Sequence, residues 1–157
     1  MQADKYTIAW FKIAECVSRG EKERALGVYR LLSHSFNDDA LASQLEADIY
    51  LSCKEKERAI GLYRRSFELY KKSKRLMEAA ATAEHLVTLV PHDILVRQEL
   101  IVLYHTLQLS SKAHTHIACL VEQYTHDSRE KLLQEFLAML QAIDEELYQY
   151  AVECIKR

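Results

Sequence analysis

The chain has 157 residues, of which 49% are hydrophobic, and its 21 lysines and arginines against 23 aspartates and glutamates leave a formal charge of −2. This balance provides no basic excess to attract a phosphate backbone or an anionic membrane, so we expect neither nucleic acid nor a membrane as a partner. With only three glycines and one proline, the chain lacks the turn residues that separate strands, and an all-α fold is expected.

Apolar residues recur at three- and four-residue intervals, which predicts eight helices. These span residues 4–18, 21–35, 38–52, 55–72, 75–90, 93–108, 111–125 and 128–155. Gly20 favours a helix end, the polar residues 37–39 can cap the next helix, and Pro91 interrupts another. Because the linkers are short, we expect antiparallel hairpins within one domain covering residues 1–157.

One segment of ten residues occurs twice. The sequence EKERALGVYR at residues 21–30 returns as EKERAIGLYR at residues 55–64, with eight identities at a distance of 34 residues. A period of this length fits one helix-turn-helix unit and predicts a stacked repeat array. Such arrays usually display a binding surface, so we expect no enzymatic activity.

Small and aromatic residues extend this pattern. Four alanines form two pairs that are each 34 residues apart, and a tyrosine precedes three of them by nine positions. The alanines are Ala25, Ala59, Ala79 and Ala113, and the tyrosines are Tyr50, Tyr70 and Tyr104. Together with Pro91 and the opening residues Trp10, Ile13, Ala14 and Val17, the pattern resembles the tetratricopeptide repeat.

The resemblance implies a right-handed α-solenoid of about three to four hairpins with a long C-terminal capping helix. The repeats would cover residues 6–37, 38–72, 55–92 and 93–126, followed by the helix at 128–155. Two of these repeats overlap because Ala59 and Ala79 are only 20 residues apart. We therefore expect a phase slip, in which helix 55–72 carries residues typical of both helices of a repeat.

The C-terminal segment has two interpretations. In the first, Leu133, Phe136 and Leu140 lie buried on helix 111–125 and cap the array. In the second, the distal part of one long helix joins two copies of the chain in a homodimer; its candidate residues are Leu147, Tyr150 and Cys154. A break near residues 144–146 would instead produce two ordinary helices.

The sequence contains no motif typical of catalysis, cofactor binding or metal binding. Scattered glycines cannot form a phosphate-binding loop, and no known catalytic motif occurs, so we expect no cofactor. His114 and His116 would point to different sides of a helix, so no metal site is expected with Cys119. The four separate cysteines and the absence of a signal peptide or long apolar segment favour a cytoplasmic location.

The resemblance also implies a function. Members of the family act as adaptors or chaperone-like scaffolds that hold a peptide or helix of another protein in a concave groove. Carried over by position, the groove residues would be Gln44, Asp48, Arg64, Glu68, Lys71, Gln98, Val102 and His105. The basic residues 64–65 and 71–75 are either a solvated helix end or a patch for an acidic peptide. The alternative function is a structural protein that assembles through its C-terminal helix.

Overall fold

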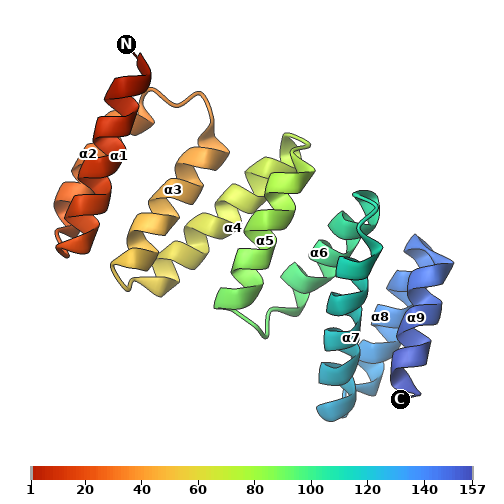
Figure 1. Ribbon diagram of the computed structural model, residues 1–157. Helices are drawn as coiled ribbons and strands as arrows, with labels where there is room; N and C mark the ends of the chain where they lie inside the picture. Colours follow the sequence, from red (N-terminus) through yellow and green to blue (C-terminus); the bar gives the residue numbers. More distant parts are fainter. Residues whose placement is uncertain (1, 157) are drawn as a thin grey trace. The chain divides into compact units, whose positions relative to one another are not determined.

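The computed structural model describes the backbone of residues 2–156 and the side chains of residues 7–156. This part of the chain is all-α, as predicted, and contains nine helices and no strand (Figure 1). The helices are α1 (Gln2–Ser18), α2 (Lys22–Ser33), α3 (Asp39–Ser52), α4 (Lys56–Lys72), α5 (Leu76–Leu89), α6 (Ile94–Thr106), α7 (Ser110–His126), α8 (Glu130–Ile143) and α9 (Glu145–Ile155). The ends of the first seven differ from the predicted ends by at most two residues.

The contacts between helices divide the chain into two compact units. The first, Met1–Leu89, holds α1 to α5, and the second, Val90–Arg157, holds α6 to α9. In the first unit α1 pairs with α2, and α4 packs against both α3 and α5. In the second unit α6 pairs with α7, while α9 packs against both α7 and α8. None of the helices in the described part combines the length and the apolar character needed to cross a membrane.

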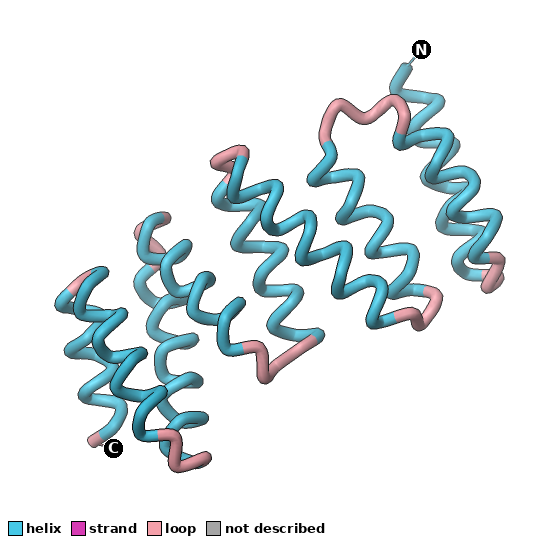
Figure 2. Tube along the Cα trace, turned by 180° about the vertical axis from the view of Figure 1, so that it is seen from behind, coloured by secondary structure: helices cyan, strands magenta, loops and turns pink. Residues whose placement is uncertain are grey.

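Five connections between helices are three-residue turns with the same backbone geometry (Figure 2). The middle residue of each turn has a positive φ between 53° and 73°: Gly20, Lys54, Lys74, Gln108 and Ser128. The amide of the next residue donates to the carbonyl five positions earlier, at 2.8–3.0 Å. In four turns this carbonyl belongs to a tyrosine: Tyr50, Tyr70, Tyr104 and Tyr124. This is the Schellman arrangement, which reverses the chain tightly and produces antiparallel neighbours.

These turns reveal a repeat of three helices. Lys54 and Gln108 are 54 residues apart, as are Lys74 and Ser128, so α3–α4–α5 and α6–α7–α8 have the same turn spacing. A side-chain hydrogen bond also recurs 54 positions further along the sequence. The Tyr70 hydroxyl donates to Gln44 Oε1 at 3.0 Å, and Gln98 Nε2 donates to the Tyr124 hydroxyl at 3.2 Å.

Alanines lie in the buried interior of both units. The four alanines of the repeat pattern, Ala25, Ala59, Ala79 and Ala113, are completely buried, with 0% of their surface exposed. The interior also holds larger side chains, including Tyr63 and Tyr70 in the first unit and Tyr124 and Phe136 in the second. Since alanine lets two helix backbones approach closely, a longer side chain at these positions would separate the helices.

The expectation of one long helix over residues 128–155 is wrong. The chain breaks at Asp144, whose extended backbone (φ −163°, ψ 133°) ends α8 and whose carboxylate caps α9 by accepting from the amide of Glu146 at 2.7 Å. This cap satisfies an N–H group that would otherwise lack a partner at the start of α9. The alternative of two ordinary helices is therefore confirmed.

This break changes the role of the C-terminal residues. Leu133, Phe136 and Leu140 are buried as predicted, and the Phe136 ring lies 5.7 Å from that of Tyr124 on α7. Leu147, however, is only 3% exposed because α9 folds back against its own unit. Leu147 is therefore not available to a second copy, while Tyr150 and Cys154, the other two candidate residues for self-association, are half-buried.

Candidate functional site

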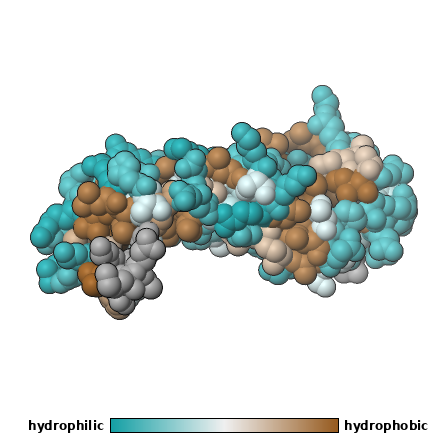
Figure 3. Space-filling view, turned by 90° about the horizontal axis from the view of Figure 1, so that it is seen from above, coloured by the Kyte–Doolittle hydropathy of each residue, from teal (hydrophilic) through white to brown (hydrophobic). Residues whose placement is uncertain are grey.

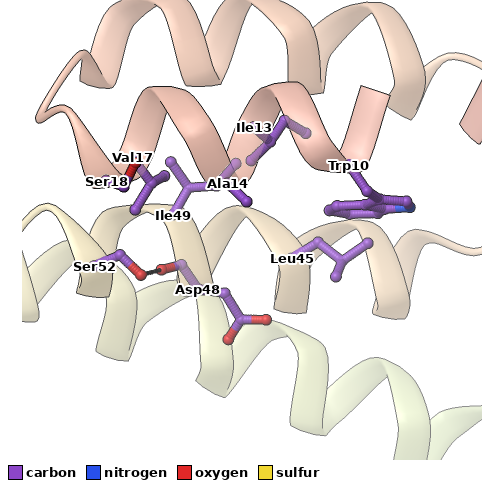
Figure 4. A pocket seen from close by; sticks show the side chains of 9 residues that line it. All are labelled: Trp10, Ile13, Ala14, Val17, Ser18, Leu45, Asp48, Ile49 and Ser52. Carbon is purple, nitrogen blue, oxygen red and sulfur yellow. Dashed lines mark hydrogen bonds between the residues drawn. The ribbon is translucent and has the colours of Figure 1, made fainter. Parts of the chain in front are cut away.

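A groove of about 330 Å³ lies between α1 and α3 in the first unit (Figure 4). We call it the α1–α3 groove. Its lining residues are Trp10, Ile13, Ala14, Val17 and Ser18 of α1, and Leu45, Asp48, Ile49 and Ser52 of α3. On each helix these residues follow three- and four-residue steps and therefore share one face. The sequence thus gives each helix an apolar stripe, and the space between the two stripes forms the groove.

The two ends of the α1–α3 groove differ in character. Trp10 and Leu45 lie at one end, and Ser18 and Ser52 lie at the other (Figure 4). The Trp10 ring stacks on Phe36 with ring centroids 6.5 Å apart and planes inclined by 10°. This contact fixes the ring, although Trp10 is only partly buried. A large half-exposed aromatic ring with a fixed orientation can anchor an apolar side chain of a ligand.

The hydroxyls at the polar end are occupied within their own helices. Ser18 Oγ donates to the Glu15 carbonyl at 2.8 Å, and Ser52 Oγ donates to the Asp48 carbonyl at 2.8 Å. These bonds reduce the tendency of both hydroxyls to seek water, so the groove surface is predominantly apolar. A site of this composition favours hydrophobic side chains over charged ones.

Asp48 joins the groove to the next helix. Its carboxylate is turned away from α1 (Figure 4) and accepts a hydrogen bond from the Tyr63 hydroxyl of α4. Burial raises the pKa of Tyr63, and the neighbouring Asp48 carboxylate raises it further, so the phenol stays protonated and remains a donor. Tyr63 also contacts the His85 ring of α5 edge-on at 4.6 Å. These interactions connect α3, α4 and α5 behind the groove.

The groove residues predicted from the sequence are not all at one place in the first unit. Asp48 lines the α1–α3 groove, and Gln44 lies one helical turn away, where it accepts from Tyr70. Arg64, Glu68 and Lys71 lie instead on α4. Lys71 pairs with Glu68 at 2.9 Å and lies over the Phe67 ring at 4.5 Å, as a solvated helix surface would.

The remaining predicted groove residues lie on α6 in the second unit. Gln98 contacts Tyr124, Val102 is 38% exposed, and His105 is half-buried. The hollows between α7 and α9 and at residues 108–112 of this unit are lined by other residues. Val17 and Leu45 were not predicted as groove residues because apolar residues at helical spacing were assigned to packing. Both are only partly buried, since the distance between α1 and α3 decides how far each apolar side chain is covered.

The two histidines of α7 have separate environments. The His114 ring stacks on Tyr150 of α9, with centroids 4.0 Å apart. His116 is buried, stacks on Tyr104 at 5.8 Å, and places Nδ1 3.2 Å from Arg97 Nη1. Within the described residues, no three His, Cys, Asp or Glu side chains are close enough to hold a metal ion.

Hydrophobic side chains also reach other parts of the surface, in patches between hydrophilic ones (Figure 3). In the first unit the largest exposures belong to Leu31 at 79%, Phe11 at 72% and Ile8 at 61%. Comparison with known proteins adds no identification, because no protein-family model, curated protein or solved structure matches the chain.

Proposed function

We propose that the chain is a protein-interaction module, an adaptor or chaperone-like scaffold, that holds a peptide or helix of a partner in the α1–α3 groove. The observation that carries this proposal is the groove itself, whose apolar surface contains the fixed Trp10 ring. A helix or peptide that places apolar residues at regular intervals can insert them between two parallel walls of this kind. Burial of those side chains would supply the binding energy.

The proposal includes the architecture. We propose that the hairpins form a right-handed α-solenoid like that of the tetratricopeptide repeat. The identical three-residue turns and the buried alanines at the crossings support it, because each gives successive hairpins the same geometry. In such an array α1 and α3 would be the first helices of two successive hairpins and would line the concave face. All four cysteines carry free thiols, which supports a reducing, cytoplasmic location.

A matched pair of substitutions tests the groove. Ala14 lines the groove and is exposed, whereas Ala81 is an exposed alanine of α5 outside it. Ala14→Glu would place a carboxylate among apolar side chains without altering a buried position, and Ala81→Glu introduces the same residue elsewhere on a helix. A displayed library of amphipathic peptides would be selected against the unaltered protein, and the affinity of the selected peptides would then be measured for each variant by fluorescence anisotropy.

We expect Ala14→Glu to weaken binding by tenfold or more, about 1.4 kcal/mol, because a charge would have to be desolvated against the ligand. Ala81→Glu should bind as the unaltered protein does. Equal affinities for both variants would place the binding surface elsewhere, and a selection that yields no binding peptide would contradict the proposed function. Far-UV circular dichroism of each variant confirms that the fold is retained.

A further inference from the structure

The second unit carries a different groove, which lies between α7 and α9. Two hollows of about 310 Å³ and 470 Å³ adjoin there, and both are lined by Tyr150. We call the combined surface the α7–α9 groove. The Tyr150 ring stacks on His114 with planes inclined by 11°, and this contact holds the two helices together at the middle of the groove. Neither hollow includes a residue of the first unit.

The floor of the α7–α9 groove is apolar. Val121 is buried, Tyr150 and Cys154 are half-buried, and Ile155 is 40% exposed. Along α7 the lining positions 114, 118, 121, 122 and 125 advance by steps that keep them on one helix face. The groove can therefore accept a row of apolar side chains in contact with both helices.

The rim, in contrast, is acidic. Four glutamates line the groove, and no lysine or arginine does so: Glu122, Glu145, Glu146 and Glu153. None of the ion pairs in the described part of the chain involves any of these four carboxylates, although Glu145 Oε1 accepts a hydrogen bond from Gln149 Nε2 at 2.6 Å. Glutamates elsewhere have cationic partners, as in Glu55 with Lys22 at 2.5 Å and Glu15 with Arg19 at 2.6 Å.

Helix electrostatics explains two of these glutamates but not the other two. Glu145 and Glu146 occupy the first turn of α9, where the positive end of the helix dipole stabilises an acidic side chain. Glu153 lies in the last turn of α9, and Glu122 lies near the C-terminal end of α7. The partial charge at the C-terminal end of a helix is negative, so the Glu153 carboxylate is unfavourably placed, and Glu122, which precedes the last turn of α7, gains no support from the helix dipole.

The four carboxylates are spread along the groove and do not surround one point. No three acidic, histidine or cysteine side chains among the described residues converge on a point that could hold a metal ion. Several separate cationic groups, as on a chain of lysines or arginines, match the distribution of the carboxylates better than one ion does. The apolar floor adds the requirement of hydrophobic residues on the same ligand.

We propose that the α7–α9 groove is a second protein-binding surface, which takes a basic amphipathic helix from another protein. The apolar face of that helix would lie on Val121, Tyr150 and Cys154, and its lysines or arginines would reach the carboxylates on the rim. This is helix-in-groove recognition, in which the floor contributes affinity and the charges select the partner. The surface is independent of the α1–α3 groove, since the two lie in different units.

The probe for the test is a synthetic amphipathic peptide of leucine and lysine at helical spacing, labelled with a fluorophore. A second peptide with glutamate in place of every lysine retains the apolar face and reverses the charge. Binding of each peptide to the full chain would be followed by fluorescence anisotropy at low and at physiological salt. We expect the lysine peptide to bind, more weakly at the higher salt, and the glutamate peptide not to bind.

Two double variants with the same net charge locate the site. Glu122→Gln with Glu153→Gln removes the two carboxylates of the rim that no helix dipole supports. Glu57→Gln with Glu130→Gln removes two exposed glutamates of α4 and α8 outside the groove. We expect the rim variant to bind the lysine peptide about tenfold more weakly and the control variant to bind it within about twofold of the unaltered protein.

Thermal melting of the free protein gives an independent readout. The rim variant should melt at the same or a higher temperature, because Glu153→Gln relieves an unfavourable charge in the last turn of α9 and Glu122→Gln removes a carboxylate that the helix dipole does not support. A lower melting temperature would show that these carboxylates serve the fold and would overturn the proposal. Failure of the lysine peptide to bind, or an equal loss in both double variants, would overturn it as well.

Discussion

The burial of α8 leads to a prediction with a matched control on the same helix. Leu140 is 0% exposed and Leu132 is 39% exposed. The same substitution, Leu→Ala, can therefore be compared at a buried and at a partly exposed position of one helix. The change removes three carbon atoms, each of which contributes about 0.8 kcal/mol when it is buried. The lost transfer free energy at Leu140 is therefore about 2.4 kcal/mol before any effect of packing is considered.

The cavity left behind adds to this loss at Leu140. Because the site is closed on all sides, we expect the free energy of unfolding to fall by about 3–5 kcal/mol. At Leu132 water can fill the vacated space, and part of the side chain is already hydrated, so we expect a loss of about 1 kcal/mol. Helix propensity cancels in the comparison because both substitutions place alanine within α8.

Urea denaturation followed by far-UV circular dichroism measures both losses. The slope of unfolding free energy against urea should stay the same in both variants, since the surface exposed on unfolding changes little. A difference between the two variants of less than about 1 kcal/mol would refute the assignment of Leu140 to the core and Leu132 to the surface. It would also remove the evidence that α8 covers α7.

The other predictions concern a buried alanine, the loss of stability at low pH, and the removal of α9. Ala59→Leu should overpack a helix crossing and lower the unfolding free energy by about 1–3 kcal/mol, whereas Ala81→Leu on an exposed surface should change it little in the same urea titration. Burial tends to raise the pKa of Asp38, but the hydrogen bond from the amide of Leu41 and the Arg75 guanidinium outweigh it and lower the pKa below its usual value. The ionised carboxylate therefore stabilises the fold above about pH 4, and this contribution is lost as the pH falls through the lowered pKa. Asp38→Asn keeps a capping residue but loses the ion pair, so its stability deficit should be present at neutral pH and vanish in acid; a deficit independent of pH would contradict the reasoning. Truncation after Ala142 should cause cooperative loss of helicity well beyond that of α9 itself, because it removes a helix that packs on both α7 and α8; a loss confined to α9 would show that α9 is dispensable.

The candidate site was only partly accessible to sequence reasoning. Asp48 was predicted by position and lines the α1–α3 groove, but the partly buried Leu45 beside it was assigned to packing. A helical pattern shows which residues share a face, and it does not show whether the facing helix is close enough to cover them. The α7–α9 groove was missed for a related reason, since its rim combines residues from two helices that are separated in sequence by α8.

The sequence by itself determined the all-α class, the first seven helices and the four alanines that lie buried within them. These features depend on local periodicity, on capping residues and on the 34-residue spacing, all of which act over short distances along the chain. The recurring geometry of the turns was not visible in the same way, because Lys54, Lys74, Gln108 and Ser128 take a conformation usually reserved for glycine.

Only the tertiary structure decided whether the C-terminal segment forms one helix or two. Its apolar residues fit one continuous helix as well as two, and the choice depended on the cap at Asp144 together with the burial of Leu147 against neighbouring helices. Packing between elements distant in sequence also determined which apolar faces are covered and which remain open as grooves. Burial is a property of the assembled helices, so it follows from their approach and not from the pattern of any one of them.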